Sequence, residues 1–212
     1  MKQGQTTRVV FKAKYIPNGI AENTNFYKIG KNTAIWNEDN LVKEIKAAVA
    51  SVVSGAAGKT TVTLKAKGND ITAAGTHYIT ADNITVTDVT AETIEKAITA
   101  INTQLGLNES KKVGISTYAG GESYYIARIK HFGDDLTKWK SGTYGENNLE
   151  YLGRYGVLRN NWYVLTVQSV SGPGYPSVPE VKPNTLDDED DNYINVSVKI
   201  LDWARRSQDV NL

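Results

Sequence analysis

The sequence predicts a mainly β protein with a helical insertion, in the β or α+β class, built as an antiparallel β-sandwich. Strand-like segments lie at both ends of the 212-residue chain, whereas two helix-like segments are confined to its middle. A parallel α/β sheet would instead alternate helices with strands along the whole chain. Because neither an internal repeat nor a second-domain boundary is evident, we expect one domain over residues 1–212 with a helix-containing excursion at about 38–110.

Two amphipathic helices are predicted in the middle of the chain. The first begins at Asp39 or Asn40, either of which can cap it, and ends at Gly55. The second begins after Thr90, its capping residue, and ends at Gly106. Their apolar residues recur at helical spacing, which predicts one buried face for each: Leu41, Ile45, Ala48, Val49 and Val52 in the first, and Ile94, Ala97, Ile98 and Ile101 in the second.

Strand patterns occupy most of the remaining sequence. Residues 8–16 mix β-branched and aromatic side chains with lysines, and residues 59–89 hold short threonine-rich strands separated by turn residues. Residues 123–132 and 162–170 are two further strands, the second with clearer alternation. The cleanest period-two pattern is at residues 194–200, where Ile194, Val196, Val198 and Ile200 alternate with Asn195, Ser197 and Lys199.

The overall charge is nearly balanced, with 24 lysine and arginine residues against 23 aspartate and glutamate residues. Such a chain has no global basic field, so we expect neither nucleic acid nor an anionic membrane as a partner. No segment is long and apolar enough to span a bilayer, and residues 1–7 lack the apolar run of a signal peptide. If the protein is exported, we expect that its targeting segment has been lost and that Met1 is an added start residue.

Residues that could support enzymatic chemistry are few. The chain has no cysteine, and its two histidines, His77 and His131, lack the neighbours of a zinc motif. Residues 55–60 end in Gly-Lys-Thr, but they follow a helix and precede a strand, the reverse of the order in a phosphate-binding loop. The acidic run 187–191 lacks the spacing of a calcium loop and is read as a solvated linker. We therefore predict no enzyme, no catalytic residue, no metal and no cofactor.

Aromatic side chains offer a second functional class, because an aromatic ring can stack on the apolar face of a sugar. In alternating strands most such residues pack in the core or at its rim. A carbohydrate-binding or tip-adhesin surface module is therefore kept as the alternative function. Its candidate residues are Tyr124, Tyr125, Trp162, Tyr163 and Tyr175.

Several segments in the second half of the chain resemble one family. Residues 155–167 contain Gly-Val-Leu-Arg-Asn-Asn-Trp-Tyr, and residues 169–176 read Ser-Val-Ser-Gly-Pro-Gly-Tyr-Pro. Together they resemble a strand and its exit in the C-terminal domain of Bacteroidales-type fimbrillins, the subunits of type V pili. Residues 191–203 and 207–212 resemble the terminal strand and tail of that family, and residues 124–131 extend the resemblance.

The resemblance implies a transthyretin-like β-sandwich and a place in a cell-surface fimbrium, anchored to the outer membrane in precursor form. It further implies cell adhesion and polymerisation by strand donation, in which one subunit inserts a strand into the groove of another. Partners would be other pilus subunits, as a homopolymer or a hetero-assembly, and host glycans or proteins are further candidates. The sequence lacks the family's lipid-attachment cysteine and an evident N-terminal domain, so it resembles the C-terminal half of a subunit.

Two stretches near the end of the sequence compete as the donated strand. Burying alternate apolar side chains stabilises such a joint by about 1.5 to 3 kcal/mol each before ordering costs. We favour residues 194–203 as an internal strand of the chain's own sandwich, which leaves residues 204–212 as the donor, anchored by Val210 and Leu212. The candidate assembly residues from both stretches are Ile194, Val196, Val198, Ile200, Trp203, Val210 and Leu212.

Overall fold

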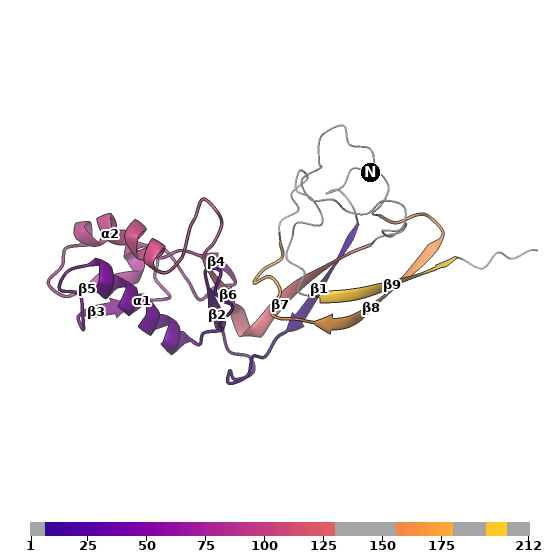
Figure 1. Ribbon diagram of the computed structural model, residues 1–212, viewed down its shortest axis with the longest axis horizontal. Helices are drawn as coiled ribbons and strands as arrows, with labels where there is room; N and C mark the ends of the chain where they lie inside the picture. Colours follow the sequence, from indigo (N-terminus) through magenta and orange to yellow (C-terminus); the bar gives the residue numbers. More distant parts are fainter. Residues whose placement is uncertain (1–6, 130–155, 180–193, 203–212) are drawn as a thin grey trace, which may run out of the picture. The chain divides into compact units, whose positions relative to one another are not determined.

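The computed structural model describes residues 7–129, 156–179 and 194–202 (Figure 1). Within these ranges the chain is mostly β with two α-helices, and its β2–β6, β4–β6, β3–β5 and β8–β9 pairs are antiparallel. This arrangement is that of a β-sandwich-like α+β fold and confirms the predicted fold class. The elements are β1 (Arg8–Lys14), β2 (Phe26–Ile29), α1 (Glu38–Val52), β3 (Thr60–Val62), β4 (Gly75–His77), β5 (Ile84–Val86), α2 (Ala91–Gln104), β6 (Ile115–Tyr118), β7 (Glu122–Arg128), β8 (Asn161–Val170) and β9 (Ile194–Asp202), with 3-10 turns at Ala81–Asn83 and Ala119–Gly121.

The chain forms two compact units, and the division between them crosses β1 and β7, which pair with each other. The first unit contains β8, β9 and most of β7, and the second contains both helices with β2 to β6. The two helices thus lie within the predicted excursion at 38–110. The prediction of a single domain over residues 1–212 stays a prediction, because two compact units can still fold as one domain.

The cap of helix α1 lies two or three residues before the predicted Asp39 or Asn40. It is Asn37, whose side-chain oxygen accepts a hydrogen bond from the Asn40 backbone N–H at 2.9 Å. Glu38 and Asp39 then fall in the first turn, where carboxylates interact favourably with the helix dipole. Asp39 and Asn40 are therefore helical residues rather than the predicted caps, because the asparagine just before them supplies the cap.

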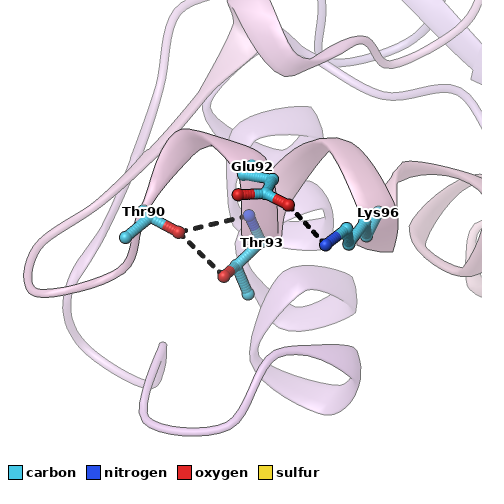
Figure 2. A network of polar contacts seen from close by, with 4 residues as sticks. All are labelled: Thr90, Glu92, Thr93 and Lys96. Carbon is cyan, nitrogen blue, oxygen red and sulfur yellow. Dashed lines mark hydrogen bonds and ion pairs between the residues drawn. The ribbon is translucent and has the colours of Figure 1, made fainter.

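Helix α2 has the predicted cap. The Thr90 hydroxyl accepts a hydrogen bond from the Thr93 backbone N–H at 3.3 Å and lies 2.9 Å from the Thr93 hydroxyl, as Figure 2 shows. One turn further, Lys96 and Glu92 form an exposed ion pair at 2.5 Å. At the other end, Gly106 adopts a positive φ of 72°, the left-handed conformation in which glycine commonly follows a helix.

The core of the second unit lies between the two helices and the small sheets. Both predicted helix faces contribute to it, together with residues from β2, β5 and β6 and from the segments that connect these elements. Its fully buried apolar side chains do not touch water, so this unit has a substantial hydrophobic core of its own. The largest of them are Tyr27, Leu41, Ile45, Val49, Ile71, Ile79, Ile101 and Ile115.

A buried hydrogen-bond network around Asn83 connects several turns of this unit. Asn83 is fully buried, and its side-chain nitrogen donates to the backbone oxygens of Thr63 and Asn69, each at 3.0 Å. Its side-chain oxygen accepts from the Asn69 side chain at 2.8 Å and from the Thr80 backbone N–H at 3.1 Å. Since a buried amide is costly unless its groups are paired, this network specifies how the turns meet.

Candidate assembly surface

Strands β8 and β9 form a two-stranded antiparallel ribbon, drawn as the orange and yellow arrows in Figure 1. Asn161 lies opposite Asp202 at one end, and Val170 lies opposite Ile194 at the other. The register shifts between Val167 and Ser169, which marks a β-bulge. Among the described residues no third strand pairs with either member of the ribbon.

One face of the ribbon is half-buried. It carries Tyr163 and Leu165 from β8 and Val198 of β9, which lies opposite Leu165. The Tyr163 hydroxyl accepts a hydrogen bond from the Leu158 backbone N–H at 2.8 Å, which ties the segment before β8 to this face. An apolar face with a satisfied tyrosine hydroxyl is typical of a sheet surface that packs on other parts of a protein.

The opposite face is exposed and carries large apolar side chains near one end. Trp162 is 64% exposed and lies directly opposite Leu201, which is 40% exposed. Val164, the next residue of β8 on this face, is 37% exposed and lies opposite the exposed Lys199. Directly opposite residues of an antiparallel pair point to the same face, so the three apolar side chains share one surface.

The predicted assembly residues divide between described and undescribed parts of the chain. Ile194, Val196, Val198 and Ile200 all lie in β9 and pair along β8 of the same chain. The structure describes half-burial for two of these side chains, those of Val196 and Val198. Trp203, Val210 and Leu212 lie outside the described residues, so their assembly role stays a prediction.

Sequence reasoning did not single out the exposed face as an assembly surface. It considered Trp162 for stacking on sugar and as part of the fimbrillin-like motif, and it did not propose Trp162, Val164 or Leu201 as assembly residues. A pattern was nevertheless present: apolar residues fill consecutive positions at the start of β8 instead of alternating with polar ones. Consecutive apolar residues in a strand indicate that both of its faces are apolar.

The five aromatic residues considered for sugar binding do not form an exposed cluster. Trp162 is exposed, whereas Tyr124, Tyr163 and Tyr175 are half-buried. Tyr125 is 3% exposed, and its hydroxyl donates to the Gly172 backbone oxygen at 3.2 Å. One exposed ring, rather than a row of rings, is thus offered to a ligand by these five residues.

The glycine-rich segment after β8 packs closely on β7. A Cβ atom added to Gly174 would lie 2.2 Å from the Tyr124 backbone oxygen and 2.8 Å from the ring of Tyr125. No side chain fits at this distance, so the backbone approach requires glycine. These contacts give a structural role to Gly172 and Gly174, two positions of the fimbrillin-like motif at residues 169–176.

The residues considered for chemistry in the sequence make local contacts where the structure describes them. Within the described ranges, no three histidine, cysteine, aspartate or glutamate side chains are grouped so that they could hold a metal ion. His77 makes a 2.8 Å hydrogen bond to the Ala73 carbonyl, and His131 lies outside these ranges. Lys59, in the turn between α1 and β3, forms an ion pair with Asp88 at 2.9 Å.

Among the residues that the structure describes, no helix is long and apolar enough to cross a membrane.

Comparison with protein families decides the identity of the region that carries the ribbon. Residues 116–209 match the family model described as "Major fimbrial subunit protein type IV, Fimbrillin, C-terminal". This part of the chain is a fimbrillin C-terminal domain. The fimbrillin match covers β7, β8, β9 and nearly all of β6, whereas α1, α2 and β1 to β5 precede it. No curated protein matches the chain.

The fimbrillin match of residues 116–209 supports a coarse function for the chain. The matched family is one of structural pilus subunits, which supports a pilus-subunit role. For this region the matched family implies a cell-surface fimbrium as the location and other pilus subunits as assembly partners. The match confirms the family resemblance that was identified from the motifs of residues 155–176 and 191–212.

Proposed function

We propose that this fimbrillin polymerises by donating residues 204–212 to a neighbouring subunit, and that the resulting polymer supports adhesion. The observation that carries the proposal is the pairing of β9 with β8 of the same chain along its whole length. Because one edge of β9 is already satisfied, the sequence that follows it is the better candidate for an intersubunit strand. This supports the choice of the tail over residues 194–203.

The tail has the chemistry of a donated strand. Val210 and Leu212 are two residues apart, so in an extended conformation both point to the same side. Inserting them beside a partner's sheet edge would add backbone hydrogen bonds and bury both side chains. At about 1.5 to 3 kcal/mol for each buried side chain, two anchors plus a backbone ladder make a joint of useful lifetime. Trp203 stands between β9 and the tail and is proposed to pack at the joint.

The cellular setting is part of the same proposal. As an exported pilus subunit, the protein would be anchored to the outer membrane in precursor form and assembled after processing. The structure and the family match support this setting through the assigned role of pilus subunit. Adhesion would then be a property of the assembled polymer, which presents many copies of the subunit to a host surface.

Deletion of Ser207–Leu212 from the full-length subunit tests the proposal. We expect the variant to fold, with an unchanged circular dichroism spectrum and thermal midpoint, and to form no pilus polymers by electron microscopy. A finer variant, Val210→Ser with Leu212→Ser, should do the same. The matched control is Ser207→Ala with Asn211→Ser, which alters the tail but keeps both anchors. Normal polymers from the deletion variant would exclude donation by this tail.

One observation favours a second candidate function, the binding of a carbohydrate. Trp162 is 64% exposed on a ribbon face that also carries polar groups, including Lys199. An exposed indole ring can stack on a sugar and leave the polar groups to bind its hydroxyls. The test is glycan binding by the folded protein and by Trp162→Ala. Saturable binding that the substitution abolishes would support a lectin-like role, and no binding by either protein would remove it.

A further inference from the structure

The end of the ribbon that precedes the tail in the sequence carries large exposed apolar side chains. Trp162 is the second residue of β8, and Leu201 is the second-last residue of β9. They lie directly opposite each other, 64% and 40% exposed. Val164 continues the same face and is 37% exposed. We call these three residues the ribbon-end patch.

Contacts within the ribbon do not account for the patch. The side chains of a cross-strand pair touch each other, but most of the Trp162 surface remains in water. Clustered exposed apolar side chains mark interaction sites in soluble proteins, and tryptophan is enriched among the residues that dominate binding energy at such sites. The patch therefore has the composition of an interface centre, with Lys199 and Ser197 as polar neighbours on the same face.

The position of the patch along the chain indicates its partner. Residue 204, where the proposed donor begins, is three residues beyond Leu201. Three extended residues reach about 10 Å at most. A subunit that takes up residues 204–212 is thus held beside this end of the ribbon, and its surface lies next to the patch.

We infer that the ribbon-end patch docks against the neighbouring pilus subunit that receives the tail. The inference rests on the proposed strand donation and adds a second contact to the same joint. Once the tail is inserted, docking of the patch is effectively intramolecular, so a small apolar surface suffices because the partner's local concentration is high. Two contacts also restrict rotation about the tail, which would give the joint a defined angle.

Site-specific photo-crosslinking in assembled pili tests the inference directly. A photoreactive phenylalanine analogue replaces Trp162 in the full-length subunit, and a matched variant carries it at Val170, which is 45% exposed at the far end of the ribbon. We expect subunit-to-subunit crosslinks from position 162 and few or none from position 170. Polymers that form normally but give no crosslink from position 162 would overturn the inference.

The strength of the joint gives a second measurement. Leu201→Ser and Trp162→Ser should leave folding and polymer formation intact, because both side chains are exposed and the tail is unchanged. Their polymers should dissociate at least several-fold faster on heating in detergent than the wild type or the Val170→Ser control. Equal dissociation rates for all four polymers would contradict docking by the patch.

These outcomes are separable from the failure of strand donation. If deletion of Ser207–Leu212 leaves polymers intact, strand donation by the tail fails, whatever the crosslinking shows. If the deletion abolishes polymers and Trp162 stays accessible to a water-soluble tryptophan oxidant in wild-type pili, the docking inference fails alone. Protection of Trp162 in pili, with reactivity in the monomer, would support docking.

Discussion

Asn69 and Asn83 are joined by two reciprocal hydrogen bonds. The Asn69 side-chain nitrogen donates to the Asn83 side-chain oxygen at 2.8 Å, and the Asn83 side-chain nitrogen donates to the Asn69 backbone oxygen at 3.0 Å. Asn83 is fully buried, so no solvent replaces these bonds when one partner is lost. The pair joins two turns of the helix-containing unit that are fourteen residues apart.

Asn83→Asp should therefore destabilise the protein by about 2 to 4 kcal/mol, because a carboxylate cannot donate to the Thr63 and Asn69 oxygens and carries a charge into the core. Urea unfolding measures the change. The control is Asn32→Ala, which removes an exposed side chain whose oxygen accepts a single backbone hydrogen bond, from Ala34. It should cost well under half as much, and equal costs for the two variants would contradict the network's role.

Tyr27 gives a prediction about alkaline stability. Its side chain is buried, and burial raises the pKa of the Tyr27 hydroxyl above the ordinary value of 10.0, with the Glu38 and Asp70 carboxylates acting in the same direction. Above about pH 10 the unfolded chain releases this proton before the folded chain does, so stability falls as pH rises. Tyr27→Phe should show a weaker fall in the urea midpoint between about pH 9 and pH 11.

The same substitution should also raise stability at neutral pH. Among the described residues no partner meets hydrogen-bond geometry for the Tyr27 hydroxyl, although the Asn25 and Glu38 side chains both act on its pKa. Removing the hydroxyl should therefore relieve the cost of a buried, poorly paired group, on the order of 1 kcal/mol. The control is Tyr78→Phe, because the Tyr78 ring is half-buried and burial raises its pKa as well. A loss of stability in Tyr27→Phe at pH 7 would show that the hydroxyl makes a stabilising contact.

Gly174 tests the close approach of the segment after β8 to β7. Gly174→Ala should destabilise the fimbrillin region by roughly 1 to 3 kcal/mol, because its Cβ would overlap the Tyr124 backbone oxygen and the backbone must shift. Thermal unfolding and hydrogen exchange of the β7 amides measure the effect. Val178→Ala, which shortens a 60% exposed side chain nearby in sequence, should be neutral. A neutral Gly174→Ala would mean that the two segments separate easily.

The start of α2 allows two neighbouring contacts to be compared. Thr90→Ala removes the cap shown in Figure 2 and should cost about 1 kcal/mol. Lys96→Ala breaks an exposed ion pair with Glu92 and should cost no more than about 0.5 kcal/mol. Urea unfolding of both variants, with high salt as a further condition, measures the difference. The loss in Lys96→Ala should shrink in salt while that in Thr90→Ala persists, and the reverse ranking would contradict the capping role.

The elements that could be predicted from the sequence depend on local patterns. Both helices were located because apolar residues recur every three or four positions and Thr90 and Gly106 mark the ends of the second. The cap of α1 was placed two or three residues too late, at Asp39 or Asn40, since Asn37 and these two residues are all capable caps and their roles depend on backbone geometry. Strands β7, β8 and β9 followed from their β-branched and aromatic residues.

Strand β2 was not predicted from the sequence, and there is a physical reason why the sequence pattern missed it. It is four residues long and largely buried on both faces, so it lacks the alternation that indicates a strand. Its conformation depends on antiparallel pairing with β6, some ninety residues away, where Phe26 lies opposite Tyr118. The two rings are stacked with centroids 4.4 Å apart. A contact of this kind has no counterpart in local sequence.

The sequence by itself predicted a β-rich chain with two helices and a second half that resembles fimbrillins, because periodicity, caps and motif residues are properties of single segments. Only the tertiary structure decided that β9 pairs with β8 of its own chain, and that Trp162 and Leu201 meet on an exposed face. Alternation tells which residues of one strand share a face, but it does not tell which strand lies beside it. That choice depends on burial and backbone pairing between segments distant in sequence, and it is what directs the assembly proposal to the tail.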